Sequence, residues 1–498
     1  MRCTALAAVV LTLVSCGGDG NTTNWKDIGA RCATPRTGID PNTGQAYPDK
    51  QGKLDDEKTW LKAWTDDTYL WYGEVPAVDA SQYTTATDYF AQLKTLAKTL
   101  SGNNKDRFHF WDTTAHWEQL SQSGVEAGYG VTWSLIAASP PRKVVAAYNE
   151  PGSPAAAQNV TRGVEVLTVD GVDVVNSTGQ SNIDILNNGL FPQAVNQTHT
   201  FTLKDLDGST RQVQLMSTNV TSTPVQNVHT IDTGASGKVG YMLFNDHLAT
   251  AEKGLIDAVN QLKMNGGIDD LVIDMRYNGG GYLAIASELA YMIAGPSKIA
   301  GRFFERLTFN DKHPTVDPVT GDQISTTPFY STSLGLSAPG GAALPTLGLP
   351  RVFVLTGSGT CSASESVLNG LAGIDVQVIQ VGATTCGKPY GFYPQDNCGI
   401  TYFSIQFKGV NAKSFGDYAD GFVPGATTAG SFAGCGVADD FTHALGDPAE
   451  ARLAAALAYR TAPTCTGLSA SSALVLGGAS GEGRVIKSIW QQNRILRR

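Results

Sequence analysis

Several signatures of common protein classes are missing from this 498-residue sequence. It contains no C-x-x-C pair and only seven scattered histidines, which argues against a structural zinc site. Its net charge of -9 argues against a nucleic-acid partner, because such proteins normally carry a basic face. It has no internal repeat of 20 to 50 residues. With 42% hydrophobic and 16% charged residues, the chain is expected to be globular and to form two to four domains. We expect no metal and no cofactor.

The first sixteen residues, MRCTALAAVVLTLVSC, carry one arginine and an apolar run that is too short to span a bilayer. Leu13-Val14-Ser15-Cys16 resembles a bacterial lipobox, in which the cysteine is acylated and becomes the mature N-terminus. We therefore predict a signal peptide over 1–15, lipidation of Cys16 and a lipid anchor in the bacterial cell envelope. Gly17, where an inner-membrane retention signal would have Asp, favours the outer membrane, facing the periplasm or the exterior. The alternative is an ordinary secretory signal.

Cysteine content agrees with export. Six cysteines remain beyond Cys16, an even number that suits an oxidising compartment; they are Cys32, Cys361, Cys386, Cys398, Cys435 and Cys465.

The pattern of apolar and turn-forming residues changes along the chain and predicts a multidomain α+β protein. A tether over 16–50 precedes a small helical region over 51–118, where Trp60, Leu61 and Trp64, and later Tyr89, Phe90, Leu93 and Leu96, have helical spacing. Short β-rich runs with Gly, Pro and Asp-Gly turns predict a β module over 119–222. Residues 466–498 form a linker and a basic tail.

A β/α domain is predicted over 223–465. The apolar runs KVGYMLF, DLVIDM, RVFVLT and VQVIQVG alternate with helical patterns over 249–264 and 282–294. The segment 310–345, rich in Pro, Gly, Ser and Thr, is predicted to be a long surface loop.

The stretch RVFVLTGSGTCSASES predicts a strand, a turn and a helix that begins near Ser362. A hydroxyl at a helix N-terminus lies where developing negative charge is stabilised. With no histidine nearby, the candidate base is Lys388, just past the strand VQVIQVG, because burial lowers the pKa of a lysine and lets it accept a proton. The alternative is that the serines only cap the helix.

The second chemical motif is LVIDMRYNGGGYL, a strand that runs into three consecutive glycines. Glycines let backbone N–H groups approach a substrate, as an oxyanion hole requires. A flexible turn before a helix is the alternative explanation.

Together these segments resemble the carboxyl-terminal processing (tail-specific) serine peptidase family. In that family the first serine of a Ser-Ala-Ser-Glu motif is the nucleophile and a Gly-Lys motif supplies the base. The resemblance therefore implies that Ser362 is the nucleophile and Lys388 the base. It also implies an oxyanion hole from Gly280 or Gly281 with Ala363, a supporting role for Glu365 and a catalytic core of the ClpP/crotonase-like type.

The resemblance extends to roughly 55–462. GVEAGYGVTWSL followed by EPGSPAAAQNVTRGVEVLTVDGVDV resembles a PDZ domain, which captures an extended peptide as an added strand. Gly128, Tyr129, Gly130 and Val131 would then bind substrate near its C-terminus. The implied activity is endopeptidase cleavage of envelope proteins or peptides. A module that only gates the active site is the alternative for the PDZ-like segment.

Two other functions stay open. A non-catalytic relative could bind peptides or apolar ligands on the same scaffold. A Ser-His-Asp esterase could use His109, His229 or His247, although Ser362 lacks the G-x-S-x-G context of such enzymes.

Some features depart from the family or lie outside its motifs. Phe392 occupies the position where some relatives have a glutamine that holds the lysine, so the group that orients Lys388 is open. We expect a disulfide between Cys361 and Cys386, against Cys386 with Cys398, and a second from Cys32 to Cys435 or Cys465. The tail GRVIKSIWQQNRILRR either forms an amphipathic helix on a membrane or, as we favour, docks on its own domain.

Overall fold

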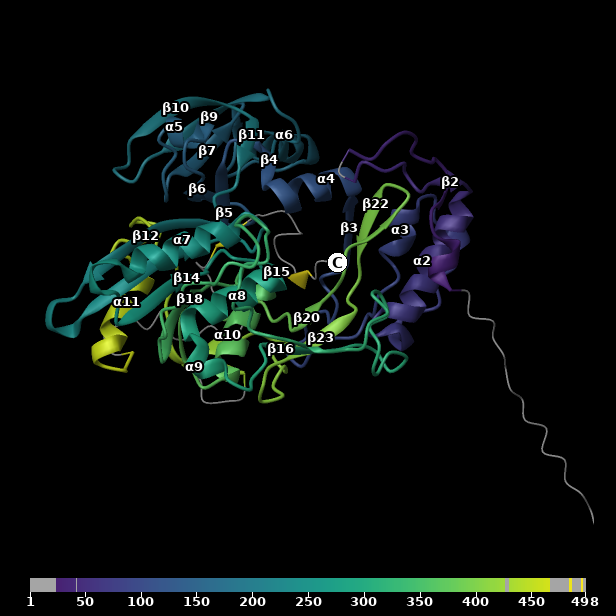
Figure 1. Ribbon diagram of the computed structural model, residues 1–498. Helices are drawn as coiled ribbons and strands as arrows, with labels where there is room; N and C mark the ends of the chain where they lie inside the picture. Colours follow the sequence, from purple (N-terminus) through teal and green to yellow (C-terminus); the bar gives the residue numbers. More distant parts are fainter. Residues whose placement is uncertain (1–23, 42, 426–429, 466–482, 486–493, 496–498) are drawn as a thin grey trace, which may run out of the picture.

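The computed structural model describes residues 24–41, 43–425, 430–465, 483–485 and 494–495 (Figure 1). The predicted signal peptide and Cys16 lie outside these residues. None of the helices in the described part of the chain has both the length and the apolar character of a membrane span.

A seven-stranded sheet forms the centre of the β/α domain. Its strands lie in the order β12 (Val225–Asp232), β13 (Lys238–Phe244), β14 (Asp270–Asp274), β18 (Arg351–Thr356), β19 (Gln377–Gly382), β25 (Ser431–Gly436) and β24 (Val423–Pro424). All neighbours are parallel except β12, which runs antiparallel to β13. Four of its strands coincide with the four apolar runs of the sequence.

Helices cover both faces of this sheet. Three pack on one face, namely α7 (Ala251–Lys263), α8 (Leu283–Ala294) and α10 (Ala363–Gly373). Helix α11 (Ala451–Thr461) packs on the other, against Phe353 and Val381. Because both faces are covered, the strands are apolar throughout instead of alternating.

The N-terminal region is only partly helical. It contains α1 (Trp25–Ile28), α2 (Leu54–Thr68), α3 (Ala86–Phe90) and α4 (Thr114–Glu118). Trp60, Leu61 and Trp64 are buried as predicted. The helical reading beyond Phe90 is wrong, because α3 ends there and Leu96 is 70% exposed.

Long-range contacts fasten this region to the β/α domain. Strand β3 (Phe110–Thr113) pairs with β22 (Ile400–Phe403), and a disulfide joins Cys32 to Cys398. The prediction that Cys32 pairs with Cys435 or Cys465 is wrong, since those two cysteines bond each other. The alternative pairing of Cys386 with Cys398 is excluded by the Cys32–Cys398 bond. Cys32 is brought to Cys398 by the packing of a segment that the sequence suggested to be a tether.

The β module forms its own sheet with the strand order β10, β9, β7, β6, β5, β26. These strands are β10 (Thr210–Met216), β9 (Thr198–Lys204), β7 (Glu165–Val169), β6 (Lys143–Asn149), β5 (Val131–Ala137) and β26 (Arg484–Val485), with β8 (Val172–Asp173) beside β7 and the helices α5 (Pro154–Ala157) and α6 (Gln180–Leu190). Strands β4 (Val125–Gly128) and β11 (Thr218–Thr221) pair next to it. The last strand of this sheet therefore comes from the far end of the chain.

Arg162 joins the β module to the core. Its guanidinium donates to the Asp439 carboxylate at 2.6 Å and to the Tyr277 hydroxyl at 2.6 Å. Arg276 donates to the same carboxylate at 2.6 Å. Arg276 and Tyr277 directly precede Asn278 and the triple-glycine segment, so the module is fastened to the core beside that segment.

Short strands complete the fold around the site. They are β1 (Arg31–Cys32), β2 (Lys50–Gln51), β15 (Gly281–Tyr282), β16 (Glu305–Thr308), β17 (Thr326–Thr327), β20 (Tyr390–Gly391), β21 (Gln395–Asn397), β23 (Phe407–Val410) and β27 (Arg494–Ile495), with α9 (Pro296–Ile299) after α8. The predicted loop 310–345 is largely irregular, but Phe329 and Leu344 within it are buried. It is therefore packed against the core instead of lying wholly on the surface.

Candidate active site

Ser362 lies at the turn between β18 and α10, immediately before the first residue of the helix. Its backbone has φ 59° and ψ -113°, a conformation that costs free energy for a residue with a side chain. The side chain is buried, and its Oγ makes no hydrogen bond within the described part of the chain. A strained backbone and an unsatisfied buried hydroxyl at a helix N-terminus are features of reactive serines.

Glu365 connects the Ser362 turn to the loop that carries Lys388. One carboxylate oxygen, Oε2, accepts from the backbone N–H of Ser362 at 2.9 Å and of Lys388 at 2.8 Å. The other, Oε1, accepts from the Gly387 N–H at 2.8 Å and the Thr385 hydroxyl at 2.6 Å. Complete burial raises the pKa of Glu365, although these four donors oppose the shift. One side chain thus fixes the distance between the two predicted catalytic loops.

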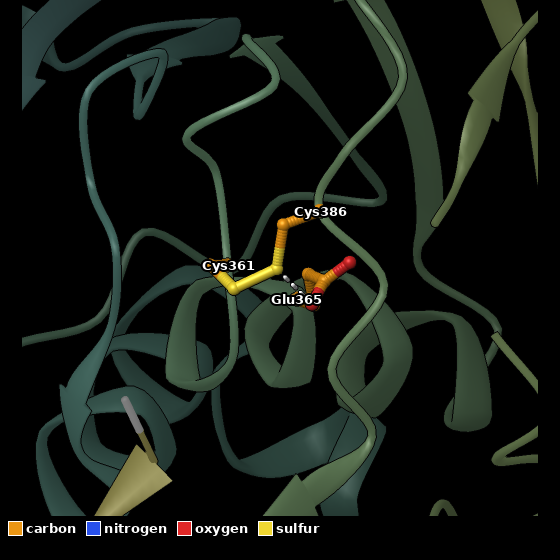
Figure 2. Close-up of side chains that lie close together, drawn as sticks. All are labelled: Cys361, Glu365 and Cys386. Carbon is orange, nitrogen blue, oxygen red and sulfur yellow. Dashed lines mark hydrogen bonds between the residues drawn. A yellow bond between two sulfur atoms is a disulfide. The ribbon is translucent and has the colours of Figure 1, made fainter. Parts of the chain in front are cut away.

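A disulfide joins the same two loops, as predicted. Cys361 bonds Cys386 with a Cα–Cα distance of 5.1 Å. Figure 2 shows the bond lying directly beside the Glu365 carboxylate. Because both sulfurs are in the disulfide, the three side chains offer no thiolate ligand to a metal.

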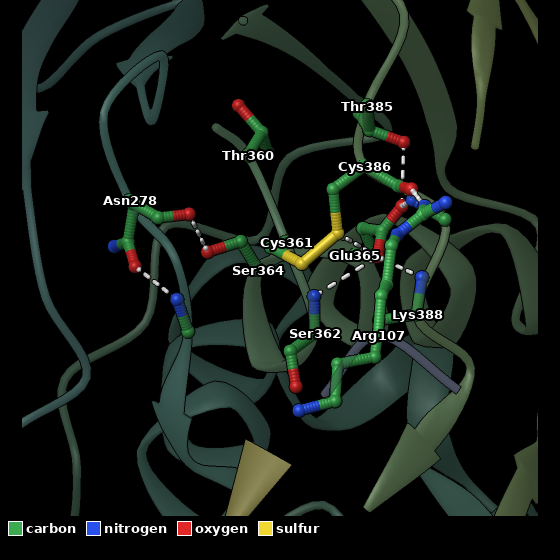
Figure 3. Close-up of a disulfide and its surroundings, with 12 residues drawn as sticks. Arg107, Asn278, Thr360, Cys361, Ser362, Ser364, Glu365, Thr385, Cys386 and Lys388 are labelled. Atoms are coloured by element: carbon green, nitrogen blue, oxygen red, sulfur yellow. Dashed lines mark hydrogen bonds between the residues drawn. A yellow bond between two sulfur atoms is a disulfide. The ribbon is translucent and has the colours of Figure 1, made fainter. Parts of the chain in front are cut away.

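The Lys388 side chain is fully buried between aromatic rings. Its Nζ lies 4.7 Å from the centre of the Phe108 ring and 4.5 Å from that of Phe392. In Figure 3 the Ser362 hydroxyl and the tip of the Lys388 side chain point toward each other. Two ring faces therefore flank Lys388, one of them at the position where some relatives have glutamine.

The triple-glycine segment lies next to the Ser362 turn. The Cys361 N–H and the Ser364 hydroxyl both donate to the Asn278 carbonyl, at 3.1 and 2.9 Å. The Gly280 N–H donates to Asn278 Oδ1 at 3.0 Å. Gly280 and Gly281 have φ of 109° and 129°, values that glycine tolerates and other residues rarely adopt. The structure thus brings both predicted glycines and the start of α10, with Ala363, to one place.

The three histidines considered for an esterase each bond elsewhere. His109 Nε2 contacts the Phe90 carbonyl at 2.8 Å, His229 Nδ1 contacts that of Asn227 at 2.8 Å, and His247 Nδ1 contacts Asn278 Oδ1 at 3.0 Å. Burial lowers the pKa of His247 to about 3. None of them is hydrogen-bonded to Ser362 within the described residues.

The predicted peptide-binding residues lie at the start of β5. Tyr129 is buried and its hydroxyl donates to the Gly189 carbonyl at 2.9 Å, so its ring belongs to the module's core. Gly130, with φ 73°, packs against Ser153, while Gly128 ends β4 and Val131 begins β5. These residues position the β5 edge.

Sequence reasoning missed several residues of the site. Arg107 donates from Nη2 to the Cys386 carbonyl, and Phe108 faces Lys388. Both come from a segment far from the motifs, and no local pattern indicated their role. Asn278 stands inside the glycine motif and Thr385 lies two residues before the Gly-Lys motif, so their positions in the sequence were a usable signal.

Part of the chain is similar in sequence to known peptidases. Residues 238–391 match the family described as Peptidase family S41. A carboxyl-terminal-processing protease of Picosynechococcus sp. (strain ATCC 27264 / PCC 7002 / PR-6) is 31% identical over 140 residues, which cover 28% of this chain and 32% of that protein. The match thus spans about a third of the relative's length.

A solved structure shares the fold over most of the chain. The "Putative S41 protease from Bacteroides fragilis NCTC 9343" is 21% identical with a TM-score of 0.59, covering 81% of this chain and 97% of that one. This likeness supports a mixed α/β, multidomain architecture. The residues matched by the S41 family model, 238–391, contain the glycine segment, Ser362 and Lys388.

Proposed function

We propose that this protein is a serine endopeptidase of the carboxyl-terminal processing type, with Ser362 as nucleophile and Lys388 as general base. The observation that carries the proposal is the shared carboxylate of Glu365, whose Oε2 accepts from the backbone of both residues. Neither residue can shift without disturbing the other, and such positioning is a large part of catalysis.

In this reaction Lys388 accepts the Ser362 proton as Oγ attacks a peptide carbonyl. The lysine then returns the proton to the leaving amine, and water, activated in the same way, releases the acyl-enzyme. The rings of Phe108 and Phe392 exclude water around Nζ. In a site with few water molecules the uncharged amine becomes more accessible, as a base requires.

The oxyanion would be stabilised by backbone N–H groups. Since the Gly280 N–H already donates to Asn278 Oδ1, Gly281 is the better glycine donor, together with Ala363 at the positive end of α10. Glu365 would act as a positioning residue and need not touch the substrate.

The remaining assignments extend the proposal to the whole chain. The β module would capture a peptide near its C-terminus through the β5 edge, as PDZ domains do. Lipidation at Cys16 would hold the enzyme in the bacterial envelope, where its substrates would be proteins or peptides.

The test is cleavage of an unfolded fluorescent protein by the purified chain. Ser362→Ala and Lys388→Ala should each lower kcat/KM by about a thousandfold or more with unchanged circular dichroism. Ser358→Ala is the matched serine control, because Ser358 lies exposed in the same turn, and Lys413→Ala is the lysine control.

Equal residual cleavage in every form would assign the activity to a contaminant. It would favour the non-catalytic binding protein. Loss of activity in His247→Ala, with retention in Lys388→Ala, would favour the esterase.

A further inference from the structure

The outer edge of the β-module sheet is covered by the chain's own tail. Strand β26 runs antiparallel to β5, with Arg484 opposite Leu135 and Val485 opposite Ser134. Without β26, β5 would be the edge strand of this sheet. A bare strand edge is a template for an added peptide strand, and here that place is taken.

A second piece of the tail lies at the catalytic site. Strand β27 runs parallel to β15, with Arg494 opposite Gly281 and Ile495 opposite Tyr282. It also lies against β20, which begins two residues after Lys388. The yellow C-terminal strand stands beside β15 in Figure 1, and a strand of that colour enters below Ser362 in Figure 3.

We infer that β5 and β15 are two subsites of one extended-peptide path, and that the tail strands β26 and β27 occupy this path as a competitive inhibitor of the enzyme's own substrates. The inference rests on the proposed function for its consequence, but the occupancy itself is a matter of binding. It also defines the substrate class as an unfolded segment that adds as a strand at both edges.

The number of residues between the two tail strands sets an upper limit on the distance between the subsites. Nine peptide units separate Val485 from Arg494, and a fully extended chain of that length reaches at most about 30 Å. A substrate held at β5 therefore needs no more than about this number of residues to present its scissile bond beside Gly281. Short peptides would fill one subsite only.

Charge favours the docking of the tail. Residues 483–498 contain five basic residues and no acidic one, whereas the whole chain has a net charge of -9. Opposite charges attract over about a Debye length and are screened by salt. Inhibition by the tail should therefore weaken as the salt concentration rises.

Gly483 offers a way to detach the tail without touching the catalytic site. It has φ 64°, and a Cβ at this position would lie 2.4 Å from Ser134 Oγ and 2.6 Å from Ile136 Cδ1. Gly483→Val must push β26 away from β5. Gly208→Val is the matched control, because Gly208 has φ 87° in the turn at the opposite edge of the same sheet and nothing within 4 Å of its Cβ position.

The experiment measures kcat/KM on the unfolded protein substrate and, separately, binding. Removing residues 483–498 should raise kcat/KM by about tenfold or more, mainly through KM, because a tethered segment has a millimolar effective concentration. Gly483→Val should also raise kcat/KM, and it replaces the truncation as the test if the truncated form folds poorly. Gly208→Val should leave kcat/KM unchanged. A synthetic 483–498 peptide should inhibit the truncated enzyme competitively, and less at high salt.

Binding of the fluorescent 483–498 peptide to truncated Ser362→Ala, measured by anisotropy, separates the two proposals. Binding without cleavage by any form would overturn the proposed function and leave the occupancy intact. No binding to the truncated chain would overturn the inference even if the enzyme is active. Unchanged kcat/KM on truncation, or rapid cleavage of the peptide by the enzyme, would overturn its role as an inhibitor.

Discussion

Two buried carboxylates in this protein fasten loops with the same number of donors, yet their pKa values shift in opposite directions. Glu365 accepts from three backbone N–H groups and one hydroxyl at the catalytic site, and burial raises its pKa. Glu252 on α7 accepts from the backbone N–H groups of Leu334, Gly335, Ser337 and Ala338. Burial opposes ionisation there too, but these donors outweigh it and the pKa is lowered.

The difference follows from depth. Glu365 lies between the central sheet's loops, where removal from water costs more than four hydrogen bonds return. Glu252 is equally inaccessible to solvent, but fewer atoms surround it under the loop 331–345, so its donors dominate. A donor count alone therefore does not fix the charge state of a buried carboxylate.

The largest effect is expected from Glu365→Gln. An amide keeps one acceptor oxygen but turns an NH₂ group toward N–H donors, so either the Ser362–Lys388 pair or the Thr385–Gly387 pair loses its acceptor. We expect kcat/KM to fall about a hundredfold, as loss of positioning does, and stability to fall by about 2 to 4 kcal/mol.

Glu252→Gln is the matched control, measured by the same assay and by urea unfolding. It also loses acceptors and should destabilise by about 1 to 3 kcal/mol, but the folded enzyme should keep its kcat/KM. Equal losses of activity in the two variants would show that Glu365 has only a structural role.

Removal of the Cys361–Cys386 disulfide should have an intermediate effect. Its two cysteines are 25 residues apart, so the double Ser variant should lose about 3 kcal/mol of stability. The loops remain joined through Glu365, so we expect kcat/KM to fall only about tenfold.

The Cys435–Cys465 disulfide, with a separation of 30 residues, provides the comparison. Its removal should cost similar stability without lowering kcat/KM. If the two double Ser variants lose the same amount of stability and the same fraction of kcat/KM, the Cys361–Cys386 disulfide does not position the catalytic loops.

The smallest effect concerns the partner of Glu252. Burial and the Glu252 charge raise the pKa of Glu288 to about 8. The folded state then holds a proton that the unfolded state has released, so stability is present below about pH 4.5 and is lost as the pH rises to 8. Since one pKa unit corresponds to about 1.4 kcal/mol, we expect stability to decrease by a few kcal/mol over this range, with no change in kcat/KM.

Glu288→Gln should flatten this dependence, because an amide can donate to Glu252 at every pH. Urea unfolding between pH 5 and pH 9 measures it. A wild-type curve that rises over this range, or a variant with the same slope, would show that Glu288 is ionised in the folded protein.

Local sequence was sufficient for the core and for much of the site. The runs at 238–244, 270–274, 351–356 and 377–382 became strands because apolar, β-branched residues between turn signals have few other solutions. The proximity of Ser362 to Lys388 followed from one strand-helix-strand unit, whose ends meet at one sheet edge. The Cys361–Cys386 bond followed from the same unit.

Tertiary structure decided what depends on distant parts of the chain. The bond of Cys32 to Cys398 and the ring of Phe108 over Lys388 join segments hundreds of residues apart. Residues 484–485 and 494–495 of the basic tail form strands that pair with β5 and β15. For these residues the predicted docking on the chain's own domains is confirmed, and the helical alternative is wrong. Their amphipathic spacing suited a helix, but two open sheet edges offered hydrogen bonds that no local pattern could reveal.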